Sequence, residues 1–431
     1  MGEQNRSLES GSHISQLFAT FAKFIIWKGT VDMFEDFLFQ KNERGYSDKA
    51  FKFLRSTLIP ATRVLFRPRI VNPENMPLTG PCFIYGNHAN YFDPFMINVP
   101  MTKEPTAGVM TRDQFHKTLP RIFMDGIGIV PTSKYVPEPG IVRSVIRMID
   151  QNRMIVIFPE GGRRWDGRPK PLIETTLKLF WKMRIPVHPV QIHGSYLGWP
   201  RWADNLRRAS VELHFLDPLH ASDFDSYESF AATCRELISF EEYDPPASAR
   251  PVSCSKPAAG IERFLYRCPD TGENGAFFTP DGREVFCRTS SLHYRMDVSS
   301  RLHTVQGETV SLIDLYDRIR SLPMVYENRK STLLLKKSGS QIYKIGDRDE
   351  LTNLDRGLAE LTSEALTVYL GSDRYRLLMH EIRYLSIEQN HKLTITSDKM
   401  RMQIDLEGQS ALQWKHYILR LKSGEEPVYS L

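Results

Sequence analysis

The sequence predicts an α/β domain with a mostly parallel sheet, preceded by amphipathic helices and followed by a β-rich domain. Between residues 70 and 240, short apolar runs alternate with helical patterns, which is typical of strands joined by helices. A Pro-, Ser- and Ala-rich stretch at residues 241–260 ends this alternation and is expected to be a linker. Beyond it the apolar runs are short and separated by turn residues, and a helical pattern closes the chain.

A chain of 431 residues is too long for one small core, so several units are expected. Their predicted boundaries follow the changes of pattern. They are residues 1–69 for the amphipathic helices, 70–240 for the α/β domain, 241–260 for the linker, 261–300 for a small cysteine-containing segment and 301–431 for the β-rich domain.

The composition is that of an ordinary folded protein, with 41% hydrophobic and 25% charged residues. The net charge of +5 suits anionic partners such as phosphorylated metabolites or acidic lipid headgroups. No cluster of Arg and Lys interleaved with aromatic residues indicates nucleic-acid binding. Five scattered cysteines argue against a disulfide scaffold and favour a reducing compartment.

The N-terminal region carries two amphipathic segments, at residues 14–39 and 53–66. Charged residues interrupt the first, and no apolar run reaches the roughly 18 residues that a membrane span needs. The first residues are polar, so no signal peptide is expected. The segments are either helices packed on the following domain or an interfacial anchor that places its apolar face in the lipid boundary. Different faces of the same helices could serve both.

Within the α/β domain, strands are expected at residues 82–86, 106–110, 154–158, 187–192 and 211–215. Helices are expected to begin at Pro94, Gly140 and Ile173. Open parallel sheets bind ligands at the carboxyl ends of their strands, so the residues that follow these runs are the first candidates for chemistry.

The stretch YGNHANYFDPF, residues 85–95, follows the first of these strands. Asp93 is expected to be the N-cap of a helix with Pro94 at its first position, which leaves His88 in the loop before it. In such a turn the two side chains can converge, and a histidine oriented by a carboxylate can remove a proton from a hydroxyl. The alternative is a polar loop in which Asp93 only caps the helix.

The stretch MIVIFPEGGRRWDG, residues 154–167, ends a buried strand in a glycine-rich turn with two arginines. Backbone amides approach a ligand closely at glycine, and guanidinium groups bind phosphate at two points, so the turn is a candidate anion site. The alternative is a solvated basic loop.

Together, NHANYFD and FPEGGR resemble the His-x4-Asp and Phe-Pro-Glu-Gly-x-Arg blocks of the glycerolipid acyltransferase superfamily, which includes the 1-acylglycerol-3-phosphate acyltransferases. Residues 70–88 are similar to the lead-in to the first block, and residues 184–196 resemble the proline-containing fourth block. The resemblance covers roughly residues 70–219, about a third of the chain.

The resemblance implies a role for each matching residue. His88 would be the general base for the acceptor hydroxyl, and Asp93 would orient it. Glu160, Gly161 and Arg163 would place a phosphate-bearing acceptor. Lys134 stands where the second block of the family has an arginine, and would hold phosphate as a point charge without a bidentate fork.

The function implied is transfer of a fatty acyl group from a thioester, acyl-CoA or acyl carrier protein, to a hydroxyl of a lysophosphatidate-type acceptor in phospholipid biosynthesis. A thioester is already activated, so a base and oxyanion donors suffice without a cofactor or metal. The chain would be monotopic or peripheral on the cytoplasmic face of a membrane. A lysophospholipid-remodelling or glycerol-3-phosphate acyltransferase is an alternative, motivated by Lys134. A non-catalytic lipid-binding or scaffold protein is the alternative from another class.

Residues 261–300 resemble a zinc ribbon that has lost half of its ligands. Cys268 and Cys287 stand where Cys-x-x-Cys pairs are usual, with Thr271 and Ser290 at the partner positions. Two thiolates do not close a tetrahedral site, so no metal is expected, and His293 is the one candidate for a third ligand.

The β-rich residues 301–431 end in a helical pattern that contains Trp414. In outline they are similar to pleckstrin-homology-like domains, and a plain β-sandwich with a packing helix is the alternative.

Overall fold

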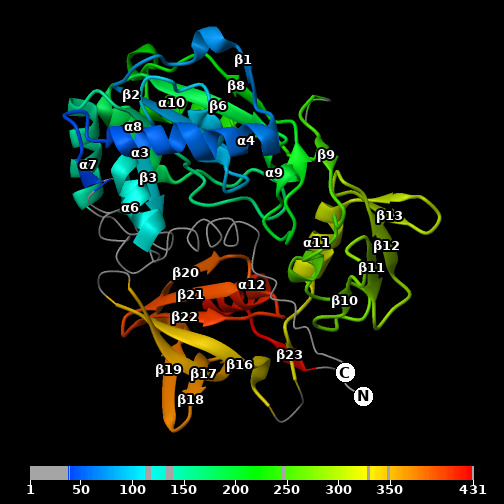
Figure 1. Ribbon diagram of the computed structural model, residues 1–431. Coiled ribbons are helices and arrows are strands. Elements are labelled where there is room, and N and C mark those ends of the chain that lie inside the picture. The colour runs from blue at the N-terminus through cyan, green and yellow to red at the C-terminus, as the bar shows by residue number, and fades with distance from the viewer. Residues whose placement is uncertain are drawn as a thin grey trace, which may run out of the picture.

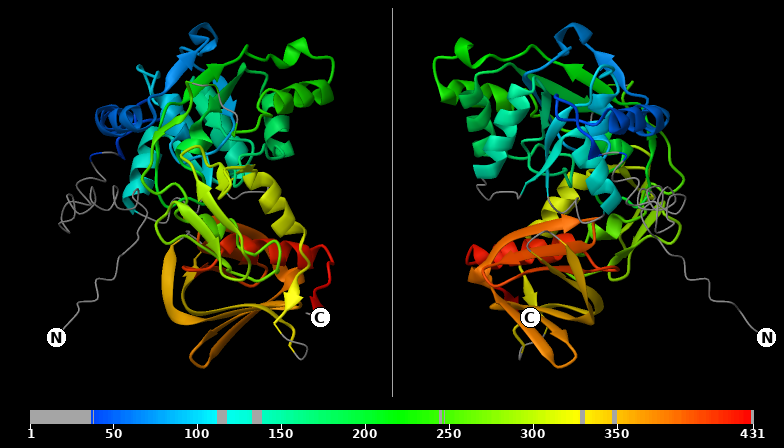
Figure 2. Two further views of the ribbon diagram at one scale, coloured as in Figure 1. Left: turned by 90° about the vertical axis from the view of Figure 1, so that its right-hand side faces the viewer. Right: turned by 60° about the vertical axis from the view of Figure 1, so that its left-hand side comes forward.

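The structure is a computed structural model that describes residues 37, 39–111, 118–132, 139–243, 246, 248–327, 331–346 and 350–429. Most of the first predicted amphipathic segment lies outside the described residues. An α/β domain, a small antiparallel sheet and a C-terminal β domain are visible in Figure 1, and the same arrangement is seen from two other sides in Figure 2.

The sheet of the α/β domain is mixed but mostly parallel, as predicted. In the described chain it has seven strands, and only β6 and β8 pair antiparallel. In spatial order the strands are β1 (Arg69–Val71), β8 (Glu212–Phe215), β6 (Val187–His193), β2 (Cys82–Gly86), β5 (Met154–Ile157), β3 (Ala107–Thr111) and β4 (Ile129–Thr132). The strands β6, β2 and β5 are therefore neighbours at the centre of the sheet, and the loops that follow them begin at adjacent positions.

Helices cover both faces of this sheet. Alternate residues of β2 point to opposite sides, so Phe83 and Tyr85 pack with Phe180, whereas Ile84 joins a cluster with Met96. The helices and turns, in chain order, are α3 (Asp48–Phe53), η1 (Leu54–Leu58), α4 (Ile59–Phe66), η2 (Pro73–Asn75), α5 (Asp93–Asn98), α6 (Thr118–Ile127), α7 (Pro139–Asp150), α8 (Glu174–Met183), α9 (Ser195–Gly198), η4 (Ala221–Asp223) and α10 (Tyr227–Glu236).

Each of the five strands predicted for this domain is present, with bounds shifted by a residue or so. The sequence analysis missed the strands β1 and β4 and the helices α6 and α10. Both missed strands lie at sheet edges, and β4 contains Pro131, a residue that sheets tolerate mainly at edges. Short, partly exposed edge strands carry little of the apolar signal by which strands are recognised.

The second predicted amphipathic segment is part of a continuous helical stretch from α3 to α4. Its inner side chains, including Leu54 and Ile59, are buried against the domain, and Val64 on the outside is 61% exposed. Among the described residues, no helix is long and apolar enough to cross a membrane.

The residues predicted to be a linker are packed on the α/β domain over much of their described length. Strand β9 (Pro251–Ser253) pairs with β7 (Arg208–Ala209), and Glu242, Ala249 and Ala258 are buried. Small alanine side chains allow this close packing, which composition alone does not indicate.

The small sheet is antiparallel, and the predicted ligand positions lie in it or in the loops beside it. The Cys268 sulfur is 3.5 Å from the Ser290 hydroxyl, whereas His293 pairs with Glu284 at 2.9 Å. Among the described residues, no three metal-ligating side chains of the His, Cys, Asp or Glu type lie together. Its elements are η5 (Ile261–Arg263), β10 (Phe277–Phe278), β11 (Glu284–Cys287), β12 (His293–Met296), β13 (Leu302–Thr304) and β14 (Thr309–Val310), followed by α11 (Leu312–Ser321).

The C-terminal β domain is an antiparallel sheet of seven strands within the described residues, closed by the predicted helix. The run at residues 375–389, predicted as one β-type run, is broken by a turn, η6 (Met379–Glu381). In spatial order its strands are β19 (Asp373–Leu378), β18 (Ala365–Leu370), β17 (Leu351–Thr362), β16 (Leu333–Ile345), β22 (Arg401–Asp405), β21 (Lys392–Ser397) and β20 (Ile382–Glu388), and the helix is α12 (Ala411–Lys422). The short strands β15 (Val325–Tyr326) and β23 (Val428–Tyr429) pair beside it.

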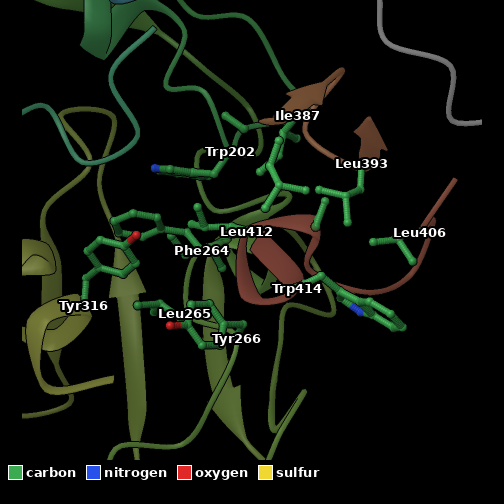
Figure 3. Packing of buried hydrophobic residues seen from close by; sticks show 14 of the residues in the cluster. Trp202, Phe264, Leu265, Tyr266, Tyr316, Ile387, Leu393, Leu406, Leu412 and Trp414 are labelled. Atoms are coloured by element: carbon green, nitrogen blue, oxygen red, sulfur yellow. The ribbon is translucent and has the colours of Figure 1, made fainter. Parts of the chain in front are cut away.

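One hydrophobic cluster joins all three parts. Figure 3 shows Trp202 of the α/β domain beside Ile387 of β20 and Leu412 of α12, with Phe264 and Tyr316 below them. Phe264 and Tyr316 stack with their ring centroids 4.0 Å apart. Contacts of this kind fix the C-terminal β domain against the α/β domain.

A buried histidine at this junction predicts a pH dependence of stability. The ring of His416 lies between the hydroxyls of Tyr266 and Tyr316, at 3.2 and 3.3 Å. Burial, assisted by the charge of Arg320, lowers the pKa of His416 to about 3. In the unfolded chain the pKa is ~6.5, so the unfolded state binds the proton first as pH falls.

Stability is therefore expected to fall as pH drops from ~6.5 towards 3, and His416→Gln should reduce the loss between pH 7 and 5 by about 1–2 kcal/mol. Urea unfolding at both pH values measures this. His380→Gln, at an exposed histidine, is the matched control. Equal pH slopes for His416→Gln and wild type would contradict the assignment.

Candidate active site

The loop after β2 brings His88 and Asp93 into contact. His88 Nδ1 lies 2.8 Å from Asp93 Oδ2, and the same oxygen accepts the backbone N–H groups of Ala89 (2.7 Å) and Asn90 (2.9 Å). The second oxygen, Oδ1, accepts the hydroxyl of Ser195 at the start of α9. Four donors thus satisfy a carboxylate that is fully buried.

Asp93 does not cap its own helix, and this prediction is wrong. Helix α5 begins at Asp93, its N-cap position is Phe92, and Pro94 is at the second position. The Asp93 carboxylate turns back to the preceding loop because that loop supplies two N–H groups and the imidazole. The predicted convergence of His88 and Asp93 is nevertheless observed.

The contact determines which imidazole nitrogen can act as a base. A carboxylate only accepts hydrogen bonds, so Nδ1 carries the proton and Nε2 has the lone pair. The His88 side chain is 19% exposed and its ring stacks on Phe158 at a centroid distance of 4.4 Å. The imidazole is therefore held by a hydrogen bond at its edge and by an aromatic ring at its face.

The glycine-rich turn after β5 lies against the His88 loop. The backbone N–H of Arg164 donates to the carbonyl of His88 at 2.9 Å. Gly161 has φ +65°, a left-handed conformation that favours glycine and lets the chain reverse directly after Glu160. The two stretches singled out in the sequence therefore form one site.

The two adjacent arginines of this turn have different environments. Arg164 is fully buried and holds Glu160 through three contacts of 2.6–3.1 Å, with Glu242 at 3.4 Å. Arg163 is 7% exposed and lies over the ring of Tyr91, 3.5 Å from its centroid. In the described chain, no carboxylate is within ion-pair distance of Arg163, which is thus the arginine available for an anion.

Behind the turn, one guanidinium faces two buried carboxylates. Burial raises the pKa of Glu242 to about 8 and also raises the pKa of Glu160. Glu160 makes the shorter contacts to Arg164, whereas Glu242 is held chiefly by Asn87, whose amide donates at 2.7 Å. Any effect of Glu160 on an acceptor is therefore indirect, through the shape of the turn.

Lys170 supports the same turn from another side. Its ammonium donates to the carbonyls of Glu160 and Gly162, both at 3.0 Å. These contacts fix the conformation of the glycine-rich backbone, so Lys170 positions the turn.

Of the predicted site residues, the structure brings together His88, Asp93, Glu160, Gly161 and Arg163. Lys134 lies outside the described residues. The sequence analysis missed Ser195, Asn87, Glu242 and Lys170. Ser195 could have been found from the sequence, because it follows β6 at the same carboxyl edge of the sheet. No feature of the sequence points to Glu242.

Comparison with known proteins identifies the domain that contains this site. The acyltransferase family matches residues 67–193. These residues form an acyltransferase domain. The 1-acyl-sn-glycerol-3-phosphate acyltransferase of Bacillus subtilis is 22% identical over 190 residues, which are 43% of this chain and 92% of that protein. The enzyme of the same name from Limnanthes alba is 24% identical over 114 residues, 26% of this chain and 40% of that protein.

The similarity is distant and covers part of the chain. This chain spans 40% of the length of the Limnanthes alba and Limnanthes douglasii relatives. A solved structure of the Thermotoga maritima 1-acyl-sn-glycerophosphate acyltransferase is 18% identical with a TM-score of 0.42, and it covers 52% of this chain and 90% of its own.

The pairing of Arg164 with two buried acids predicts a large stability effect in the acyltransferase domain. Arg164→Met should lower the free energy of unfolding by about 3–5 kcal/mol, since it leaves Glu160 and Glu242 buried without a cation. Arg235→Met is the matched control: its partner is Glu174, the two side chains are 45% and 47% exposed, and the cost should stay below about 1 kcal/mol. Equal urea midpoints for the two variants would contradict the structural role of Arg164.

Proposed function

We propose that the chain transfers a fatty acyl group from an acyl thioester to the hydroxyl of a lysophosphatidate-type acceptor, with His88 as the general base. The observation that carries the proposal is the contact between His88 and a fully buried Asp93, next to an arginine with no carboxylate partner in the described chain. The acyltransferase family match supports the reaction class, and the names of the relatives support the acceptor.

The site residues suffice for the steps of this reaction. Nε2 of His88 takes the proton of the acceptor hydroxyl as its oxygen attacks the thioester carbonyl, and Asp93 stabilises the imidazolium that forms. The tetrahedral intermediate collapses with loss of the thiolate, which takes the proton from His88. The ester bond forms as the thioester bond breaks, so no redox partner is needed.

Arg163 would hold the acceptor phosphate. A glycerol backbone places the phosphate only a few bonds from the reacting hydroxyl, so a phosphate site must lie close to the base. Arg163 meets this requirement, because it stacks on Tyr91 of the His88 loop and its neighbour Arg164 is hydrogen-bonded to the His88 carbonyl. Its five N–H donors match phosphate oxygens in two-point fashion.

Removing the base should remove the activity. His88→Ala is expected to lower acyl transfer about 100- to 10,000-fold, since general-base catalysis contributes an effect of that size. Release of CoA thiol from acyl-CoA in the presence of lysophosphatidate measures it. His220→Ala, at an exposed histidine of the same domain, is the control, and thermal unfolding checks that both variants fold.

Wild-type turnover in His88→Ala would contradict the mechanism. A panel of lysophosphatidate, glycerol-3-phosphate and lysophosphatidylcholine identifies the acceptor. No thiol release with any of them would favour a lipid-binding protein without catalysis.

We also propose that the chain works at a membrane surface. Helix α7 exposes Val142 and Ile146, at 43% and 42%, together with Arg143 and Arg147. Apolar and basic side chains on one exposed helix suit an anionic lipid surface. Within the described residues, the seven antiparallel strands closed by α12 support a pleckstrin-homology-like fold for the C-terminal β domain.

Introducing charge on α7 tests this surface. The double variant Val142→Asp, Ile146→Asp should bind vesicles containing acidic phospholipid about tenfold more weakly in a sedimentation assay, because two apolar side chains no longer enter the lipid. Val305→Asp, at a valine that is 72% exposed on another part of the chain, should bind as wild type does. Undiminished binding of the double variant would exclude α7 from the membrane contact.

A further inference from the structure

Four cationic side chains gather where the glycine-rich turn of the acyltransferase domain meets the C-terminal β domain. They are Arg163, Lys170, Arg201 and Lys415, here called the cationic cluster. Arg163 and Lys170 belong to the turn and its following loop, Arg201 follows α9, and Lys415 lies on α12. Lys415 is more than 210 positions away from the others in sequence, and only domain docking brings it here.

Arg201 is the physical link between the two domains. One guanidinium nitrogen, Nη1, donates to the carbonyl of Arg163 at 2.9 Å, and the other, Nη2, donates to the carbonyl of Ile387 in β20 at 2.8 Å. Its guanidinium also lies over the ring of Trp165, 4.6 Å from the centroid. Its Nε is buried and has no hydrogen-bond partner. Arg201 is thus fixed in place, and its Nε–H donor is unused.

The packing of α12 holds Lys415 at this junction. Leu412 and Trp414, its neighbours on α12, are buried in the cluster that contains Trp202 and Ile387 (Figure 3). Trp202 immediately follows Arg201, so the packing that docks α12 also brings Lys415 close enough to Arg201 for their charges to interact. Lys415 itself is only partly buried, and within the described chain its ammonium has no hydrogen bond or ion pair.

The cluster lacks the negative charge that such a set of cations requires. Burial, together with the charge of Arg201, lowers the pKa of Lys170 to about 7 and that of Lys415 to about 8. Glu160 interacts electrostatically with Lys170, and Asp93 with Arg163. Each carboxylate is already hydrogen-bonded elsewhere, however: Glu160 to Arg164 and Asp93 to His88. In the described chain, no carboxylate pairs with Arg163, Arg201 or Lys415. Partly or fully buried cations without acidic partners favour an anion from outside the chain.

We propose that the cationic cluster binds the phosphate monoester of the acceptor and that Lys415 of the C-terminal β domain completes this site. The inference rests on the proposed function and extends it: the acceptor site spans two domains, and residues outside the family-matched segment 67–193 select the headgroup. A monoester carries a charge of about −1.5 to −2 at pH 7, whereas a phosphodiester carries −1, so several unpaired cations favour the monoester.

The location favours the acceptor over the thioester donor as the source of this phosphate. The cluster begins at Arg163, which contacts the His88 loop through Tyr91. In an acyl-CoA the phosphates are separated from the thioester by the long pantetheine arm, whereas in lysophosphatidate the phosphate and the hydroxyl share one glycerol. A phosphate site adjoining the base therefore fits the acceptor.

The test uses the full chain and the variant Lys415→Met, which removes the charge but keeps an unbranched stem. Lys344→Met, at an exposed lysine of the same domain, is the matched control. Calorimetry measures the Kd of short-chain lysophosphatidate, of the monoacylglycerol with the same chain, and of CoA. Steady-state thiol release gives KM and kcat in parallel.

For Lys415→Met, the Kd and KM for lysophosphatidate are expected to rise about tenfold, the effect of one lost contact to a charged group. The kcat, the affinity for monoacylglycerol and the affinity for CoA should change less than twofold, and Lys344→Met should match wild type. Unchanged lysophosphatidate affinity in Lys415→Met would overturn the inference. A weakened affinity for CoA alone would also overturn it, by assigning the cluster to the donor.

The binding measurement separates this inference from the proposed function. If the wild-type chain binds lysophosphatidate through Lys415 but releases no thiol, the two-domain phosphate site stands and the acyl transfer does not. If thiol release is normal and Lys415→Met behaves as wild type, the acyl transfer stands and the two-domain site does not.

Discussion

The buried carboxylate of Asp93 is the interaction on which the arrangement of the site depends. A carboxyl group away from water is tolerated only when hydrogen-bond partners surround it, and here the partners come from two separate segments. The loop after β2 supplies the imidazole of His88 and two backbone N–H groups, and α9 supplies the hydroxyl of Ser195. Satisfying one carboxylate therefore fixes the loop, selects the tautomer of His88 and ties the loop to the end of β6.

A second buried network fixes the position of the turn after β5 relative to that loop. Arg164 binds Glu160 through its side chain and the His88 carbonyl through its backbone, so the electrostatic pairing behind the turn and the position of the base are coupled. Lys170 closes the turn by its two carbonyl contacts. These groups do not need to touch a substrate; they hold the residues that would.

Part of this arrangement could be predicted from the sequence. The strands β2, β5 and β6 are buried apolar runs, and parallel strands that share a carboxyl edge bring the loops after them together, which is why His88, Asp93 and Arg163 could be named in advance. The different environments of Arg163 and Arg164 could not be predicted. Arg164 is buried between Glu160 and Glu242, and Glu242 lies 78 residues after Arg164 in a stretch whose composition indicates only a linker. Asp93 was expected to cap α5 because N-cap statistics describe local chemistry, whereas the imidazole and Ser195 are non-local competitors.

Domain docking explains how the site can keep cations that would otherwise be unfavourable. Bringing Arg201 and Lys415 together out of water costs free energy, and the lowered pKa of Lys415 reflects that cost. The apolar contacts among Trp202, Ile387 and Leu412 offset it. Because hydrophobic burial is not directional, it can hold like charges at a separation that their repulsion opposes. The charge is relieved either by loss of a proton from Lys415 or by an anion, and in the site that we propose the anion is the phosphate group of the acceptor.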